Sequence, residues 1–282
     1  MTTEPRTDDE ANRAIEPSRT SERKRTTGGE PATDGGRPTG RNRTTDGDRG
    51  ADREPSRRAN WAVAYDVEPI RIRDPVAEAL AVLEPGRPFE IDYEDAVVAA
   101  GHSCPTAAGA YRIAQVGLDA LYPDDLPVRS EVEVFAAGPE TDPGYGVTGR
   151  LLSYVTGAAG AGGFGGLAGG VGDRRDLLSY DAFETDAAGP TVRFRRTDTG
   201  RAVEVTYRVG DVPAAGPGVD HLPDLVAGTA DDEERAAFRE AWYERVRAVL
   251  RDDALFDVAV LDEGEGGSES EGEGGRENEA GD

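Results

Sequence analysis

Hydrophobic positions recur at helical spacing in five stretches of the chain. Residues 105–122 are the clearest case, because apolar side chains repeat every three or four positions down to Pro123. Shorter stretches begin at Asp74 and at Asp92, and a fourth closes at Gly157. A long amphipathic stretch follows Thr229, which we expect to be its N-cap. The positions that share a face in the five stretches are Val76, Leu80, Leu83; Ala96, Val97, Ala100; Tyr111, Ala114, Leu118, Leu121; Val147, Leu151 and either Tyr154 or Val155; and Phe238, Ala241, Trp242, Val246, Val249.

Helix-end signals support the first two of these helices. Asp74 is suited to cap a helix, and Pro75 fits the first helical position. Asp92 with Asp95 three positions later has the spacing of a capping box. Gly101 is placed to end the second helix in a left-handed conformation.

Alternating apolar and polar residues predict four strands, at 131–136, 177–180, 191–196 and 202–208. The last two flank the short Asp198-Thr199-Gly200 connection, which is typical of a hairpin. Helices and strands interleave without a repeat. We therefore predict one α+β domain over residues 59–261, in which a mixed β-sheet is packed with helices.

The two ends of the chain differ in composition from this domain. Residues 1–58 are rich in Thr, Arg, Gly, Asp, Glu and Pro, and residues 262–282 are mostly Gly, Glu and Ser. Such segments bury too little apolar surface to offset the entropy of ordering. We predict that both are disordered tails.

The charge of the chain indicates in which environment the protein works and which kinds of partner it avoids. The formal net charge is −24, from 32 basic and 56 acidic residues, and Lys24 is the only lysine. Strong acidity suits a protein hydrated at high salt, where self-repulsion is screened. Together with the polar N-terminus, which has no signal-peptide pattern, it indicates a cytoplasmic protein of a halophilic archaeon. We expect neither nucleic acid nor an anionic membrane as partner.

The candidate chemistry centres on His102 and Cys104. Cys104 is the only cysteine, so an internal disulfide is excluded, and His102 is one of two histidines. Pro105 suits the first position of the third helix, which makes Cys104 its N-cap residue. The helix macrodipole and unpaired N–H groups there favour thiolate over thiol. The pair can serve as two metal ligands or as a nucleophile with its base; the alternative is a small buried residue that only caps the helix.

Three further features are weaker candidates. Residues 157–172 are mostly Gly and Ala, and we interpret them as a flexible loop over a site or as close backbone packing, not as a phosphate cradle. Arg174 and Arg175 follow this loop and are candidates to hold an anionic substrate group, or else a solvent-exposed pair beside neighbouring acids. His221 lies in a Pro/Gly-rich linker, where a surface loop is the default and a distant metal ligand the lesser alternative.

Several of these motifs resemble a known family. Gly101-His102-Ser103-Cys104-Pro105, followed by a helix with Arg112, resembles the Gly-His-x-Cys-Pro signature of formylmethanofuran dehydrogenase E-subunit-like proteins. Residues 156–164 resemble the second block of that family, and residues 198–201 its later hairpin. The similarity spans about residues 74–209.

The resemblance implies an α+β core with a mixed sheet, a homodimer, and a divalent metal, usually zinc, or a reactive site at His102 and Cys104. Arg112 carries over as a substrate-binding candidate. The chain departs from the family at several positions. It has Thr106 where the family often has glycine, Ala158 or Ala159 where many relatives have cysteine, and no C-terminal cysteine-rich zinc module.

Three hypotheses follow from the residues and the resemblance. The first is an accessory protein that binds a divalent metal through His102 and Cys104 and acts in metal or cofactor handling near a redox enzyme. The second is an enzyme with Cys104 as nucleophile, His102 as general base and the glycine-rich loop as lid. The third is a structural or adaptor domain in which the pair caps a helix.

Overall fold

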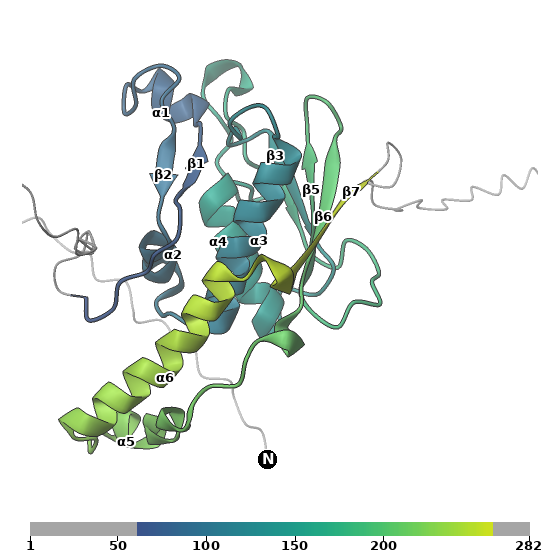
Figure 1. Cartoon of the computed structure of the whole chain (residues 1–282). Helices are drawn as coiled ribbons and strands as arrows, with labels where there is room; N and C mark the ends of the chain where they lie inside the picture. The colour runs from purple at the N-terminus through teal and green to yellow at the C-terminus, as the bar shows by residue number, and fades with distance from the viewer. Residues whose placement is uncertain (1–60, 262–282) are drawn as a thin grey trace, which may run out of the picture. The chain divides into compact units, whose positions relative to one another are not determined.

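The structure is a computed structural model that describes residues 61–261. The predicted tails, 1–58 and 262–282, lie outside the described residues. The described part alternates helices and strands as the sequence predicts (Figure 1). In chain order its helices and strands are β1 Ile70–Ile72, α1 Pro75–Ala79, β2 Phe89–Ile91, α2 Tyr93–Ala100, α3 Pro105–Leu121, β3 Val132–Ala136, α4 Pro143–Thr156, β4 Leu178–Ser179, β5 Thr191–Arg196, β6 Ala202–Tyr207, α5 Leu222–Ala227, α6 Asp232–Arg251 and β7 Phe256–Leu261. Short 3-10 helices add η1 Ala168–Gly170, η2 Val209–Asp211, η3 Pro217–His221 and η4 Asp253–Leu255.

The main sheet has five strands in the order β4-β3-β5-β6-β7. Strand β4 runs parallel to β3, and the other neighbours are antiparallel, so the sheet is mixed. A separate antiparallel pair is formed by β1 and β2. This arrangement confirms the predicted α+β class with a mixed sheet.

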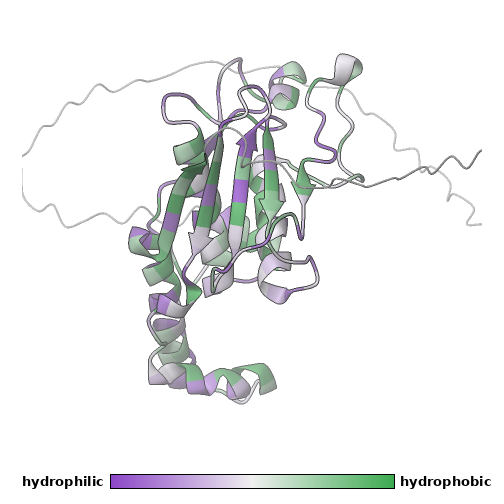
Figure 2. Cartoon of the chain, turned by 90° about the vertical axis from the view of Figure 1, so that its right-hand side faces the viewer, coloured by the Kyte–Doolittle hydropathy of each residue, from purple (hydrophilic) through white to green (hydrophobic). Residues whose placement is uncertain are grey.

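Helix α3 packs on one face of the sheet, against β5, β6 and β7, and contacts α4 and α6 on its other sides. It can lie close because Gly109 faces the ring of Tyr207 and Gly117 faces the ring of Phe194. Val132 and Val134 of β3 are buried, and so are Val192 and Phe194 of β5 and Val203, Val205 and Tyr207 of β6. Hydrophobic and hydrophilic positions alternate along these strands (Figure 2).

The opposite face of the sheet carries ion pairs between adjacent strands. Arg193 on β5 pairs with Glu204 on β6, with 2.8 Å between Nε and Oε2. Arg195 pairs with Glu133 on β3, with 2.6 Å between Nε and Oε2. Opposite charges at directly paired positions stabilise a sheet face that solvent reaches.

Two helix predictions were wrong in detail. We predicted that Leu80 lies on the buried face of the first helix, but the helix ends at Ala79 and Leu80 is 60% exposed. The helix stops there because Ala81 adopts a left-handed conformation, with φ of 57°. The N-cap of α6 is Asp231, not Thr229, because Asp231 forms a capping box with Glu234.

Strands β1, β2 and β7 were not predicted. Three-residue strands such as β1 and β2 are too short to show alternation in the sequence. Strand β7 shows no alternation either, because residues 258–261 are all apolar. Among the helices that the structure describes, none has the length and apolar character needed to cross a membrane.

Candidate functional site

The candidate site begins at the turn between α2 and α3, which forms as the local sequence predicts. Asp92 and Asp95 make the capping box of α2, and Gly101 ends that helix with φ of 78°. Cys104 is the N-cap of α3 and Pro105 its first residue. The turn therefore projects two chemically active side chains from between two well-capped helices.

His102 and Cys104 converge. The Sγ atom of Cys104 lies 3.3 Å from Nε2 of His102. His102 is exposed to solvent, whereas Cys104 is half-buried and packs against the hydrophobic core. Nδ1 of His102 lies 3.1 Å from the carbonyl oxygen of Ala100. A carbonyl only accepts, so Nδ1 carries the proton and Nε2 presents its lone pair to the sulfur. The N–H of Ala107 also donates to Sγ at 3.4 Å, as expected of an N-cap.

Ser103, between the two residues, anchors the turn to the core. Its hydroxyl accepts a hydrogen bond from Tyr65 at 2.9 Å and lies 3.1 Å from the hydroxyl of Tyr93. Its carbonyl accepts from the indole N–H of Trp242 on α6, also at 2.9 Å. The rings of Tyr65 and Tyr93 meet edge to face, with centroids 4.7 Å apart. The backbone that carries His102 and Cys104 is thus held by contacts from both earlier and later parts of the chain.

We expect the protein to lose stability at alkaline pH, because Tyr65 and Tyr93, which contact the turn through Ser103, are shielded from solvent. Burial raises the pKa of Tyr65 to about 12, despite its bond to Ser103, and burial also raises the pKa of Tyr93. Unfolded tyrosine titrates near pH ~10. The native state therefore holds protons that the unfolded state loses, and stability falls as the pH rises from about 10 toward 12.

Denaturant titrations at pH 9 and 11 measure this fall. The variant Tyr65→Phe, which keeps the ring, is expected to lose less stability between the two pH values than the wild type. Equal losses in the two proteins would contradict the assignment.

An open cleft lies beside His102, and Cys104 is not among the residues that line it. Its volume is about 610 Å³, and His102 and Ala100 form one wall. The facing wall comes from α4 and the segment before it, and from Ala159 and Gly160 of the glycine-rich segment. The polar side chains in the wall besides His102 are Glu140, Thr141, Asp142, Arg150, Ser153 and Tyr180.

These cleft residues were not predicted as site residues. The Asp142-Pro143 pair repeats the cap signal of Asp74-Pro75, and Asp142 indeed caps α4. This signal would have started the fourth helix four residues earlier than Val147. Only the tertiary packing of α4, however, shows which of its side chains face His102.

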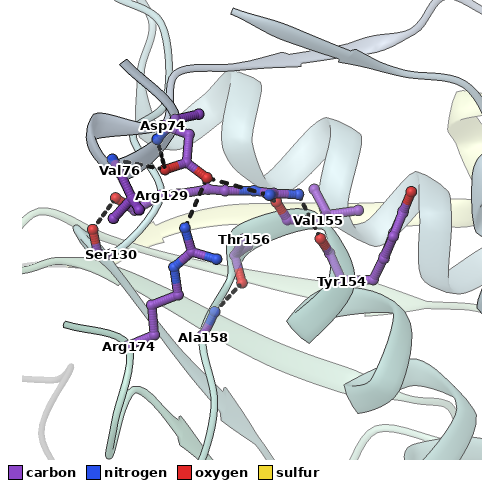
Figure 3. Close-up of polar contacts among 10 residues, drawn as sticks. Asp74, Val76, Arg129, Ser130, Tyr154, Val155, Thr156, Ala158 and Arg174 are labelled. Carbon is purple, nitrogen blue, oxygen red and sulfur yellow. Dashed lines mark hydrogen bonds and ion pairs between the residues drawn. The ribbon is translucent and has the colours of Figure 1, made fainter. Parts of the chain in front are cut away.

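A buried ion-pair network fixes the end of α4 and the segment that follows it (Figure 3). Asp74, whose side chain is 4% exposed, pairs with Arg174 at 2.7 Å and with Arg129 at 3.4 Å. Arg129 also donates to the carbonyl oxygens of Tyr154 and Val155 in the last turn of α4. The network ties α1 to the cleft-facing part of the chain.

The charge of Asp74 is stabilised within this network. Burial alone would raise the pKa of its carboxyl group. The Ala77 N–H bond and the guanidinium groups of Arg174 and Arg129 outweigh burial, and the pKa is lowered. Asp74 is therefore ionised in the folded state at neutral pH.

The glycine-rich segment packs against its own backbone. The N–H of Ala159 donates to the carbonyl of Arg174 at 2.9 Å, and the N–H of Arg174 donates to the carbonyl of Phe164 at 2.8 Å. A side chain at Gly163 would lie 3.0 Å from the Arg174 carbonyl oxygen. Of the two interpretations of the run, close backbone packing describes this part of it.

The three predicted substrate-binding arginines are engaged elsewhere. Arg112 contacts Gln115 and Asp253, Arg174 pairs with Asp74, and Arg175 pairs with Asp173 at 2.5 Å. None of the three lines the cleft. Their role toward a substrate remains a prediction.

Within residues 61–261, a metal at the turn would find two protein donors. His102 and Cys104 offer one nitrogen and one sulfur, and no third His, Cys, Asp or Glu donor joins them there. The one group of three such donors in the described part of the chain is His221, Asp224 and Glu234.

No protein-family model matches the chain, and no match to it was found among the curated proteins. The resemblance to formylmethanofuran dehydrogenase E-subunit-like proteins therefore remains a hypothesis carried by its motifs.

Proposed function

We propose that this protein binds a divalent metal, zinc foremost, through Nε2 of His102 and Sγ of Cys104. One observation carries the proposal: the two donors lie 3.3 Å apart. Zinc bonds of about 2.3 Å to sulfur and about 2.0–2.1 Å to nitrogen place two tetrahedral ligands roughly 3.5 Å apart. The bond from Nδ1 to the Ala100 carbonyl adds support, because metal-binding histidines commonly donate their other N–H to such a group.

Two protein ligands leave coordination positions open. Water or groups from a second copy of the chain would fill them, which fits the homodimer that the resemblance implies. An exposed, incompletely ligated metal can be delivered to or taken from another molecule. We therefore propose an accessory role in metal or cofactor handling beside a redox enzyme, in the cytoplasm of a halophilic archaeon, with neither nucleic acid nor membrane as partner.

Metal analysis of protein purified at high salt tests this proposal. The wild type is expected to contain about one equivalent more zinc than the variant Cys104→Ser. Taking the difference between the two proteins removes metal bound anywhere else on this acidic chain. Equal zinc content in the two proteins would contradict the proposal.

A second function is favoured by a separate observation. The chain of contacts from the Ala100 carbonyl through His102 to Cys104 is complete as a nucleophile, a base and a group that orients the base. His102 Nε2 would accept the thiol proton, and the thiolate would add to a substrate carbonyl carbon while the C=O π pair moves to the oxygen, which then takes the proton back from His102. The substrate would have to reach the sulfur from the cleft that His102, but not Cys104, lines. Ala159 and Gly160 of the glycine-rich segment form part of the cleft wall.

Alkylation kinetics test this alternative. Under it, metal-free Cys104 reacts rapidly with iodoacetamide at pH 7, and His102→Ala slows the reaction. A sluggish thiol that does not respond to His102→Ala would contradict it. If both this test and the zinc test are negative, the adaptor hypothesis is the one left.

A further inference from the structure

The second histidine of the chain also lies among metal-ligating side chains. His221 ends η3, Asp224 lies in α5, and Glu234 lies in the first turn of α6. One ligand atom from each lies within 4.8 Å of the other two. We propose that His221, Asp224 and Glu234 form a second divalent-cation site, independent of the His102–Cys104 pair.

In each carboxylate of this group, one oxygen accepts a hydrogen bond that orients the side chain. The other oxygen of each carboxylate can bind a cation. Oε2 of Glu234 accepts the N–H of Asp231 at 2.9 Å, while Oε1 lies 3.7 Å from Nδ1 of His221. Oδ1 of Asp224 accepts from the hydroxyl of Thr229 at 3.2 Å. Hydrogen bonds of this kind hold carboxylate ligands in place around protein-bound metals.

A cation at this site would brace a part of the fold that has few buried side chains. Figure 1 shows that α6 begins away from the sheet, beside α5, and runs back toward it. Neither η3 nor α5 contains a buried residue, and Val226 on α5 is 80% exposed. We call η3, α5 and the start of α6, residues 217–234, the arm. Its η3 packs on α6, where Gly218 approaches the carbonyl of Ala237 and the side chain of Ala241, but neither η3 nor α5 has a buried core. A cation bound to three segments of the arm would brace it.

The ligand set selects the kind of cation. One imidazole nitrogen and two carboxylate oxygens suit zinc, manganese or cobalt, and leave positions for water. No sulfur takes part, so a cobalt ion here lacks the intense thiolate charge-transfer band that a cobalt ion on Cys104 would show. This spectral difference separates the two proposed sites.

Cobalt binding by the full chain in concentrated KCl tests the proposal. The variant Cys104→Ser serves as background, because it removes the only thiol. By equilibrium dialysis it is expected to bind one equivalent more cobalt than the double variant Cys104→Ser/His221→Ala. Glu234→Gln in the same background is expected to lose the same equivalent, although glutamine can still accept the Asp231 N–H and keep the cap. Glu233→Gln, with the same charge change on the exposed side of that turn, is the control and keeps it.

Each outcome bears on this site alone. If the His102–Cys104 pair binds no metal, the wild type shows no thiolate band, but the loss caused by His221→Ala remains. Equal cobalt binding by Cys104→Ser and by its His221→Ala and Glu234→Gln derivatives would overturn the proposal. Circular dichroism of each variant confirms that α6 is intact.

Discussion

Asp74→Asn is expected to lower the free energy of unfolding by about 3 kcal/mol. Removing one partner of a buried ion pair costs about 3–5 kcal/mol, because the remaining charge stays buried without compensation. We expect the lower end of this range, since Arg129 keeps its bonds to the carbonyls of Tyr154 and Val155. Asparagine is itself a good N-cap, so this variant isolates the charge from the cap of α1. Urea denaturation at neutral pH measures the change.

Asp142→Asn is the matched control for Asp74→Asn. Asp142 also caps a helix that begins with proline, but it is exposed, and its carboxylate bonds are to the backbone N–H groups of Gly144 and Tyr145. Asparagine also caps helices well, so Asp142→Asn is expected to cost less than about 1 kcal/mol. Similar costs at Asp74 and Asp142 would contradict the buried network.

The Asp74 effect also has a predicted pH dependence. Because the pKa of Asp74 is lowered in the folded state, its contribution is complete above the unfolded value of about 3.9. This contribution to stability is lost as the pH falls through the pKa that Asp74 has in the folded state. The difference in stability between wild type and Asp74→Asn should therefore shrink below about pH 4.

Loss of either proposed ligand is expected to weaken zinc binding at the turn by at least about 100-fold. Removing a group that only orients a metal ligand costs about 10–100-fold, so removing the ligand itself should cost no less. The variants Cys104→Ser and His102→Ala test this in competition titrations with a zinc chelator. Ser153→Ala, in the wall of the same cleft, is the control and should bind as the wild type does. An unchanged affinity in His102→Ala would remove the imidazole from the site.

Signals confined to a few residues predicted the geometry of the turn. The capping box of α2, the left-handed Gly101 and the Cys104-Pro105 start of α3 each depend on interactions within four residues. Such contacts form wherever the local sequence allows them. The position of Cys104 at a helix start therefore follows from a short stretch of chain. Its approach to His102 was only a hypothesis from the sequence, because neighbouring residues on a tight turn can also point apart.

Contacts between distant parts of the chain could not be predicted in this way. Arg174 was predicted as a candidate to bind an anionic substrate group. In the structure its ion-pair partner is Asp74, which lies 100 residues earlier in the chain. Trp242 supports the turn by a hydrogen bond to Ser103, 139 residues away. The sequence shows each charge or ring, but only the packing of the helices and the sheet decides which partner each one meets.

We propose that His102 and Cys104 bind one metal ion together. The rate of alkylation of metal-free protein at pH 7, with and without one added equivalent of zinc, tests it most directly, because Cys104 is the only thiol in the chain. To keep zinc from the arm, the measurement is made in the His221→Ala variant. Zinc is expected to suppress the reaction, and His102→Ala is expected to abolish this protection. An alkylation rate that zinc leaves unchanged would contradict this proposal.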